Sequence, residues 1–305
     1  MNQSLRIWLD AARPKTLPLA LVSIVTGSAL AFSHGAMSWS VAQLALLTAT
    51  LLQILSNLAN DYGDAVKGTD NEQRLGPMRA MQSGAVTQQE MKTAIILNVI
   101  LTVVAGLALV FHALDSLQSI LAFVGLGVLA IIAAIAYTVG NKPYGYVGLG
   151  DLSVFIFFGL LGVSGTYFLH TGQVDIGLFL PAVGCGLLAV AVLNVNNMRD
   201  IENDSACGKR TMAVRLGQQR AKGYHFALLF SAVFCFTLYL SLNTSSLWVS
   251  LPFLLSLFAV IKHGKAVWRT TTPAQIAPMM PIVVKCSLVT NLLFSGVVIA
   301  QTLMT

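Results

Sequence analysis

The feature that most constrains this chain is a series of nine long apolar segments. They lie at residues 17–34, 41–60, 92–112, 118–139, 151–170, 176–197, 223–242, 246–262 and 282–303. An α-helix needs about 20 apolar residues to cross the roughly 30 Å of hydrocarbon in a bilayer. Within lipid a helix satisfies its own backbone hydrogen bonds, which an open strand does not. The pattern therefore predicts an all-α polytopic membrane protein with nine transmembrane helices.

The composition excludes a water-soluble globular fold. Of the 305 residues, 56% are hydrophobic and 10% are charged, whereas a soluble domain carries about 25% charged residues.

The first apolar segment, preceded by Arg6, Arg13 and Lys15, also resembles a cleavable signal peptide. Because further apolar segments follow at once, a first transmembrane helix is the simpler interpretation.

The positive charges predict the orientation of the chain. All 18 lysines and arginines lie before the first span or around the connections that follow the second, fourth, sixth and eighth spans. Cytoplasmic connections of membrane proteins are enriched in these residues. We therefore expect the N-terminus in the cytoplasm and the C-terminus outside. Contact with anionic membrane lipid then explains the pI near 9.3, and no nucleic-acid partner is predicted.

Two long loops on the predicted cytoplasmic side, about 61–91 and 198–222, suggest the internal organisation. They follow the second and sixth spans, which are four helices apart, and each begins with a group of Asn and Asp residues. The whole chain, 1–305, is predicted to be a single domain. It would consist of two four-helix halves, about 17–139 and 151–262, and a ninth helix at about 282–303.

The two Asn/Asp groups have the spacing of metal ligands on a helix. The members are Asn57, Asn60, Asp61 and Asp64 in the first group, and Asn196, Asp200 and Asp204 in the second. Each set shares one helix face at a helix C-terminus, where the helix dipole disfavours a carboxylate by about 0.3–1 kcal/mol. Mg²⁺ would remove that cost, and it prefers oxygen ligands and substrate phosphate. The groups therefore predict Mg²⁺ ions on a diphosphate, against the simpler interpretation of solvated loop ends.

Several basic residues near these groups are candidates to bind the diphosphate. Lys142 is the only basic residue in the Gly-rich loop 137–151, Lys209 and Arg210 follow the second group, and Arg79 follows the first. The alternative for each is that it anchors a cytoplasmic loop by its positive charge. Lys142 is the strongest candidate, because one isolated charge is not needed to set the orientation.

Four tyrosines are further candidate site residues. Tyr62, Tyr137, Tyr144 and Tyr146 lie near the same predicted face. They either form an interfacial aromatic belt or shield a carbocation by cation–π attraction.

The four cysteines, Cys185, Cys207, Cys235 and Cys286, have no metal-ligand spacing and are predicted to be small core residues.

Specific motifs resemble a known family. NDYGD at 60–64 and NNMRDIEND at 196–204 are similar to the two Asp-rich motifs of the UbiA-type intramembrane prenyltransferases. RPKTLPLA at 13–20 and YTVGNKPYGYVGLGD at 137–151 narrow the resemblance to the branch that acts on 1,4-dihydroxy-2-naphthoate. The similarity covers nearly the whole chain. One departure is Gly68, where many members of the superfamily have a further Asp; the next acid here is Asp70.

The resemblance implies a bundle around a cavity open to the cytoplasmic side of a bacterial inner membrane. It implies transfer of a polyprenyl group from polyprenyl diphosphate to 1,4-dihydroxy-2-naphthoate, with loss of CO2 and diphosphate, giving demethylmenaquinone. Mg²⁺ would be held by Asp61, Asp64, Asp200 and Asp204, with Asn60 and Asn196 in support. The remaining residues that it implies for substrate binding are Lys142, Lys209, Arg210, Arg79, Tyr137, Asn57, Asn197, Arg13, Lys15 and Asp151.

Two rival functions stay open at this point. Another acceptor, such as 4-hydroxybenzoate, homogentisate or haem, would keep the family and change the substrate. A cation-coupled transporter would also place acidic residues in a membrane, although such sites usually lie near the middle of the bilayer. Asp151 and Asp204 are the candidates for a general base, should one be needed. The sequence makes no prediction of the prenyl chain length or the oligomeric state.

Overall fold

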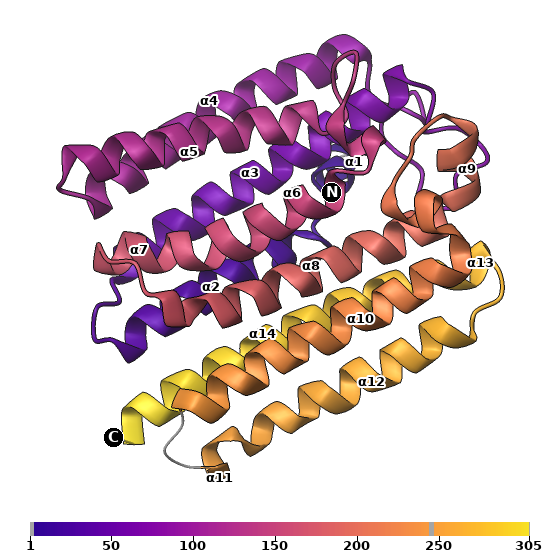
Figure 1. The fold of residues 1–305 in the computed structure, drawn as a ribbon. Helices are drawn as coiled ribbons and strands as arrows, with labels where there is room; N and C mark the ends of the chain where they lie inside the picture. The colour runs from indigo at the N-terminus through magenta and orange to yellow at the C-terminus, as the bar shows by residue number, and fades with distance from the viewer. Residues whose placement is uncertain (1–2, 244–246, 305) are drawn as a thin grey trace.

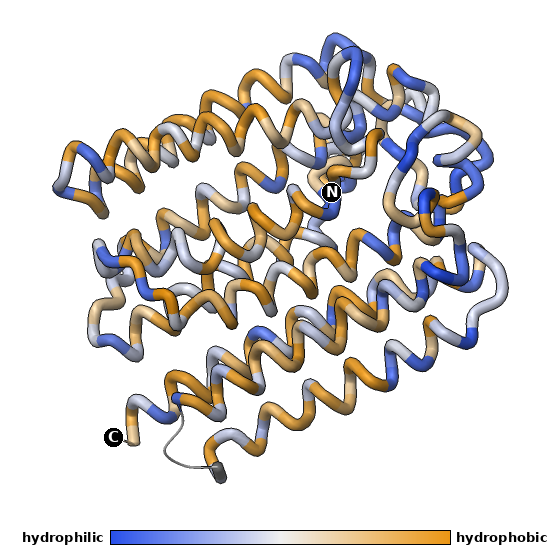
Figure 2. The backbone as a smooth tube through the Cα atoms, in the orientation of Figure 1, coloured by the Kyte–Doolittle hydropathy of each residue, from blue (hydrophilic) through white to orange (hydrophobic). Residues whose placement is uncertain are grey.

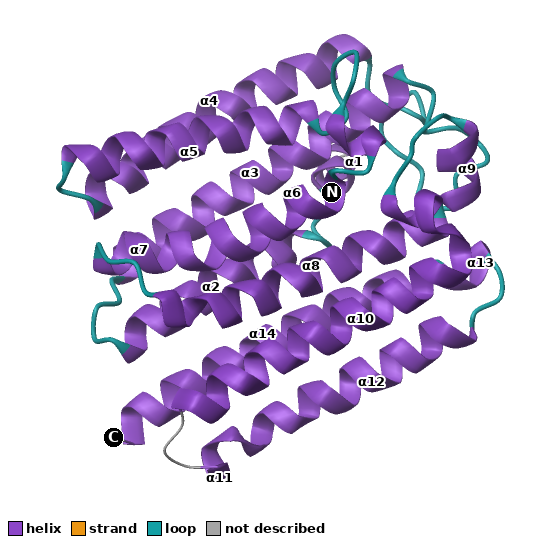
Figure 3. Ribbon diagram, in the orientation of Figure 1, coloured by secondary structure: helices purple, strands orange, loops and turns teal. Residues whose placement is uncertain are grey.

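The computed structural model describes residues 3–243 and 247–304, and every regular element among them is helical (Figures 1 and 3). The nine predicted spans appear in order as α2 (Leu17–Ser33), α3 (Trp39–Val66), α4 (Gln88–Ala113), α5 (Leu117–Ala136), the continuous α6, η2 and α7 (Gly150–Val154, Phe155–Gly165 and Thr166–Thr171), η3 and α8 (Ile176–Leu178 and Phe179–Arg199), α10 (Met212–Asn243), α11, η4 and α12 (Leu247–Ser250, Leu251–Phe253 and Leu254–Arg269), and α14 (Met279–Met304). Four short helices lie between or before them: α1 (Gln3–Ala12), η1 (Tyr144–Val147), α9 (Ile201–Ala206) and α13 (Pro273–Ile276).

These helices confirm the prediction of a multi-pass membrane protein. Eight of the described helical segments are long and apolar enough to cross a membrane by themselves. The ninth is α2, which meets the same criterion together with α1 across a bend of 54°. Ser246, the first residue of the eighth predicted span, lies outside the described residues.

The helices extend beyond the predicted spans at the end that carries the charges. Helix α3 continues to Val66, so Asp61 and Asp64 lie in its last turns and not in a loop. Helix α4 begins earlier than predicted, where Thr87 and Glu90 form a capping box. Helix α10 begins at Met212 but is interrupted at Gly217, which has a φ of 74°. Apolar length marks the part of a helix inside lipid, and a helix continues into water wherever its capping allows.

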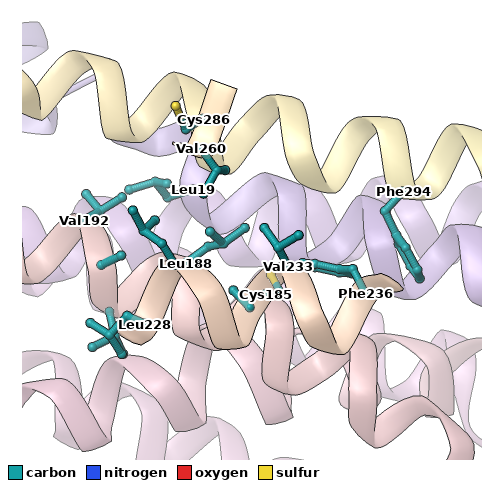
Figure 4. Packing of buried hydrophobic residues seen from close by; sticks show 14 of the residues in the cluster. Leu19, Cys185, Leu188, Val192, Leu228, Val233, Phe236, Val260, Cys286 and Phe294 are labelled. Carbon is teal, nitrogen blue, oxygen red and sulfur yellow. The ribbon is translucent and has the colours of Figure 1, made fainter. Parts of the chain in front are cut away.

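Helix α8 forms the centre of the packed core. Most of its residues from Pro181 to Arg199 are buried, and it packs against α10, η2 and α14. Figure 4 shows Leu188, Val233 and Phe236 among the apolar side chains that fill the space between these helices. At one crossing two backbones meet directly, since a Cβ added to Gly159 would lie 2.7 Å from the Cα of Gly186. Small residues permit such approaches between membrane helices.

Helices α4 and α5 are packed differently from this core. Helix α5 has no buried residue, and a Cβ added to Gly125 or Gly127 would meet no atom within 4 Å. Lipid therefore contacts one side of this pair, and the other side is left free to form the wall of a cavity.

The polar residues gather at one end of the bundle, which we call the polar end. It carries the connections at 67–87, 137–149, 200–211 and 270–278, and Figure 2 shows hydrophilic colour concentrated there, while the long helices are mainly hydrophobic. The loops that follow α3 and α8 therefore meet at the same end, as the alternation of spans requires.

The division into two related halves plus a ninth helix stays a prediction.

Three of the cysteines, Cys185, Cys235 and Cys286, are buried as expected. The prediction was wrong for Cys207. It lies in a half-exposed position just after α9, where Asn71 donates a 3.4 Å hydrogen bond to its sulfur.

Candidate active site

A deep cavity of about 1580 Å³ runs from the polar end into the bundle. Its inner part is lined by apolar and small side chains of α3, α4, α5 and η2, among them Ala45, Leu107, Phe123, Gly127 and Phe157. Ala45 and Asp64 both line it and lie nineteen residues apart on α3, a rise of about 28 Å. The cavity is therefore about as deep as the hydrocarbon layer is thick, and most of its charged lining residues lie on the loops and helix ends of the polar end.

The first Asn/Asp group stands on the last turns of α3. A Cβ at Gly63 would lie 2.6 Å from the Thr138 hydroxyl, so α3 is pressed against the segment that follows α5. Thr138 donates a 2.9 Å hydrogen bond to the Ala59 carbonyl across this contact. Asn60 and Asp61 line the cavity, and each has a buried Oδ1 atom without a hydrogen-bond partner. These two oxygens are acceptors that a bound cation would satisfy.

Both carboxylate oxygens of Asp64 contact protein groups. Its Oδ1 accepts a 2.7 Å hydrogen bond from the Tyr146 hydroxyl, and its Oδ2 lies 3.6 Å from the Lys209 ammonium. The same ammonium lies 3.8 Å from Oδ1 of Asp204. Lys209 therefore lies between the first Asn/Asp group and the second, and the structure brings the two groups together.

The second group is divided by a break in the helix. Asp200 ends α8 with a φ of −101° and a ψ of 15°, and Asp204 lies in the first turn of α9. The expectation of one helix face for all three members was therefore wrong for Asp204, although its backbone N–H still donates to the Asp200 carbonyl at 2.8 Å. At that position the dipole of α9 favours a carboxylate.

Asp200 is held by a guanidinium that the sequence did not single out. Arg199 donates from Nε to Asp200 Oδ1 at 2.9 Å and from Nη2 to Oδ2, a two-point contact. Its Nη2 also donates to the side-chain oxygen of Asn196 at 2.9 Å. Both Arg199 and Asp200 line the cavity and are buried.

The loop after α3 contributes a second set of charges. Arg74 Nε lies 3.1 Å from Asp70 and 3.7 Å from Asp200, so it links this loop to the end of α8. Arg79 Nε lies 3.9 Å from the other oxygen of Asp70. A Cβ at Gly76 would lie within 2.6 Å of the guanidinium nitrogens of Arg74 and Arg199. The loop backbone therefore passes directly beside the two guanidinium groups.

The bend between α1 and α2 directs a further cation to the site. Arg13 has a φ of 54°, the one non-glycine residue with a positive φ among those described, and Pro14 follows it. Its carbonyl accepts from the Thr16 hydroxyl at 3.0 Å, and its Nη2 is buried without a partner at the cavity wall. Asn57 donates to the Ala12 carbonyl at 2.8 Å, tying this bend to α3.

Burial dominates the electrostatics of the loop residues. It raises the pKa of Asp204 to about 6, against the attraction of Lys209. Burial also raises the pKa of Asp70, opposed first by Arg79. The pKa of Arg79 is lowered well below its ordinary value by burial and then by the neighbouring Arg13 and Arg74. These charges are therefore confined in a medium of low polarity, where each depends on its neighbours.

We refer to ten interacting side chains at the cavity mouth as the charged cluster. Its members are Asp61, Asp64, Asp70, Asp200 and Asp204, with Arg13, Arg74, Arg79, Arg199 and Lys209. Of the other predicted site residues, Asn60, Asn196, Asn197 and Tyr137 line the cavity, Asn57 lines it while bonded to the bend, and Lys15 lines its outer edge in an exposed position.

The donor set fits a hard divalent cation. No group of three or more His, Cys, Asp or Glu side chains in the described part of the chain is arranged around one point. Mg²⁺ does not require such a cage, since it uses one or two protein carboxylates with waters and substrate phosphate. The unpartnered oxygens of Asn60 and Asp61, with the carboxylates of Asp200 and Asp204 that line the same cavity, meet that description.

Three of the predicted site residues do not line the cavity. Lys142 and Arg210 are both exposed. The backbone N–H of Arg210 donates a 2.8 Å hydrogen bond to the Tyr146 carbonyl. Asp151 is buried beside the cavity wall but accepts a 2.9 Å hydrogen bond from Tyr224. Spacing along the sequence cannot show which way a loop side chain turns.

Some of the four tyrosines singled out in the sequence line the cavity and others do not. Tyr137 and Tyr144 line the cavity, with their rings edge to face at 5.3 Å. Tyr62 is directed elsewhere, into the apolar cluster beneath α1, with Lys92 over its ring.

Arg74 and Arg199 were missed as site residues because positive charge on this side of a membrane protein has a simpler explanation. A signal for Arg199 is its place inside the second motif, between Asn196 and Asp200.

A membrane-embedded helical bundle with a deep apolar cavity, closed at its mouth by paired Asn/Asp groups and cations, defines an intramembrane enzyme of the prenyltransferase class. The sequence comparison agrees with this class. The model of the UbiA prenyltransferase family matches residues 20–288. The chain belongs to this family, which confirms the resemblance of its motifs.

Its relatives include proteins that match nearly the whole chain and others that match about three quarters of it. A 1,4-dihydroxy-2-naphthoate octaprenyltransferase of Escherichia coli (strain K12) is 52% identical over 295 residues, which cover 96% of either chain. A protein of the same name from Mycobacterium tuberculosis is 41% identical over 223 residues, covering 73% of this chain and 74% of the relative.

Solved structures have the same fold. A UbiA homologue from Aeropyrum pernix K1 superposes with a TM-score of 0.66 at 16% identity, covering 93% of this chain and 97% of the homologue. A UbiA homologue from Archaeoglobus fulgidus, bound to GPP and Mg²⁺, gives a TM-score of 0.65 at 17% identity, covering 96% of this chain and 99% of the homologue. These similarities establish the architecture of the bundle.

Proposed function

We propose that this protein transfers a polyprenyl group from polyprenyl diphosphate to 1,4-dihydroxy-2-naphthoate. The observation that carries the proposal is the position of the charged cluster at the mouth of a deep apolar cavity, in a chain half identical along its length to a relative named for that reaction. A diphosphate would lie at the charged mouth, and its prenyl tail would occupy the apolar depth.

Mg²⁺ is the metal that we propose for the site. Asn60, Asp61, Asp64, Asp200 and Asp204 would hold it, with Asn196 in support, and when bound it would stabilise negative charge on the diphosphate. Amide and carboxylate oxygens form this set, which suits Mg²⁺ better than a softer metal.

The cations of the charged cluster would bind the diphosphate from several sides. Arg74 and Arg199 lie over Asp200, Lys209 lies between Asp64 and Asp204, and Arg13 has a buried nitrogen without a partner. Such fixed donors stabilise charge that grows on a leaving group without reorganising during the reaction. The apolar walls would exclude water from the allylic cation formed as the carbon–oxygen bond breaks.

The acceptor would approach beside the bend between α1 and α2. Arg13 and Lys15 line the cavity there, and their positive charge would attract the naphthoate carboxylate. The ring carbon that bears the carboxylate forms the new carbon–carbon bond, and the bond to CO2 then breaks, returning its electron pair to the ring. The balance needs no external oxidant and gives demethylmenaquinone in its reduced, hydroquinone form.

We propose that the polar end faces the cytoplasm, with the C-terminus outside, in a bacterial inner membrane. The support is the distribution of Lys and Arg among the connections. The two relatives are named for octaprenyl transfer, and the depth of the cavity is compatible with a long prenyl tail.

The test uses purified protein in liposomes with labelled polyprenyl diphosphate and 1,4-dihydroxy-2-naphthoate, with and without Mg²⁺. We expect a lipid-soluble product that requires Mg²⁺ and is lost in Asp64→Asn and Asp200→Asn. The matched control is Asp115→Asn, an exposed aspartate at the opposite end of the bundle, which should retain full activity. Transfer to 4-hydroxybenzoate alone would overturn the acceptor, and no transfer by folded protein to any aromatic acceptor would overturn the reaction.

A further inference from the structure

Tyr146 is a buried residue of η1 whose hydroxyl contacts the first Asn/Asp group. The hydroxyl oxygen lies 2.7 Å from Oδ1 of Asp64 and 2.6 Å from the Thr69 hydroxyl. The Tyr146 hydroxyl donates its single proton to Oδ1 of Asp64. Thr69 must then donate its own proton to Tyr146. The direction of both hydrogen bonds is therefore fixed, from Thr69 through Tyr146 to Asp64.

The same chain of contacts reaches the second Asn/Asp group. Asn203, next to Asp204 on α9, donates a 2.8 Å hydrogen bond to the Thr69 carbonyl. Tyr146 therefore lies between the end of α3 and the start of α9, on a path of hydrogen bonds separate from the Lys209 ion pairs. Tyr146 does not itself line the cavity, so it acts on the site through these neighbours.

Tyr146 also contacts Lys209 in two ways. The Lys209 ammonium lies 5.1 Å from the centre of the Tyr146 ring, within the range of a cation–π contact. The Tyr146 carbonyl accepts a 2.8 Å hydrogen bond from the N–H of Arg210, the next residue after Lys209. Both contacts hold the ammonium over the space between Asp64 and Asp204.

We propose that Tyr146 is the positioning residue of the diphosphate site, setting the Asp64 carboxylate with its hydroxyl and the Lys209 ammonium with its ring. This inference rests on the proposed function, because it assumes that these two charges bind a metal diphosphate. The residue acts before chemistry, on binding of the diphosphate complex.

The test separates the hydroxyl from the ring. Tyr146→Phe keeps the ring and removes the hydrogen bond to a charged acceptor, which should weaken binding of inorganic diphosphate with Mg²⁺ about tenfold in calorimetry. Tyr146→Leu also removes the ring and should weaken binding by about a further twofold to fivefold. In the transferase assay both should raise KM for the prenyl diphosphate, with kcat at saturation changed less than about threefold.

Two further variants keep the test decisive. Thr69→Val removes the donor to Tyr146 and leaves the tyrosine in place, so a smaller loss of diphosphate affinity in the same direction is expected. Tyr62→Phe is the matched control, since it removes a tyrosine hydroxyl from α3 on the side facing away from the cavity. It should bind diphosphate as the unaltered protein does.

The result that overturns the proposal is unchanged diphosphate affinity in folded Tyr146→Phe. A fall in kcat with unchanged KM would overturn it too, because that pattern places the residue in the chemical step. The unaltered protein is assayed alongside. If it binds Mg²⁺ diphosphate but transfers no prenyl group, the proposed reaction fails while the binding measurements still decide the role of Tyr146.

Discussion

The contact between Arg199 and Asp200 yields a quantitative prediction about stability. The two side chains are 5% and 6% exposed, and two N–H groups of the guanidinium face the two carboxylate oxygens. Replacing Arg199 by Gln removes this partner and leaves a buried carboxylate with reduced compensation. Such single removals from buried ion pairs cost about 3–5 kcal/mol.

The surroundings of Asp200 reduce that cost. Arg74 Nε lies 3.7 Å from Asp200 Oδ2 and supplies part of the missing charge. We therefore expect Arg199→Gln to lower the free energy of unfolding by about 2–4 kcal/mol. For a chain of 305 residues the corresponding fall in Tm is roughly 3–6 °C. Because the cost arises from the orphaned charge, Arg199→Gln/Asp200→Asn should be more stable than Arg199→Gln alone.

The measurement is thermal unfolding in detergent without metal or substrate, so it does not depend on the catalytic role of either residue. Arg220→Gln removes an exposed arginine from α10 and should leave Tm unchanged within about 1 °C. Equal stability of the single variant and the unaltered protein would refute the reasoning. So would strictly additive losses in the double variant, since these would mean that the two side chains do not interact.

Three further predictions test other parts of the site. Gly63→Ala would press a methyl group against Thr138 and should lower both Tm and activity, because either α3 or the segment after α5 must move; unaltered activity would contradict the contact. Lys209→Gln should reduce transferase activity at least about tenfold, since it removes a charge-assisted contact, whereas the exposed Lys142→Gln should change it less than twofold; comparing their kcat/KM values tests the prediction that Lys142 binds the diphosphate. Gly127→Phe fills open space in the cavity wall and should shift preference towards shorter prenyl diphosphates, measured with a series of chain lengths; an unchanged preference would place the tail elsewhere.

The membrane-spanning architecture was predictable because lipid imposes one strong physical rule. Every backbone polar group in hydrocarbon must be satisfied within its own segment, so apolar length alone located the nine spans. The ends of the spans were less predictable, since water places no comparable limit on helix length. The extension of α3 to Val66 and the break at Gly217 in α10 show this difference.

The acidic half of the site was also predictable, but the arrangement of its cations was not. Carboxylates at the end of a membrane helix are costly enough to stand out, as Asp61 and Asp200 do. An arginine on the same side has a general explanation in membrane topology, which hid Arg74 and Arg199. Lys142 attracted attention because it is isolated in its loop, yet the fold turns its side chain to solvent. Direction in a loop depends on tertiary contacts that helical spacing does not record.

The balance of charge in the cluster predicts how its ligands bind. Its five carboxylates and five cations cancel, and most are buried. Adding a bare diphosphate would leave a large negative charge in a medium of low dielectric, which is costly. Adding Mg²⁺ alone would leave positive charge beside the arginines. Two Mg²⁺ ions and one diphosphate together nearly cancel, so metal and diphosphate should each strengthen binding of the other by at least about tenfold, a coupling of about 1.4 kcal/mol. Calorimetry with inorganic diphosphate, with Mg²⁺ and with EDTA, measures this coupling, and equal affinity under both conditions would show that the cluster does not act as a balanced unit.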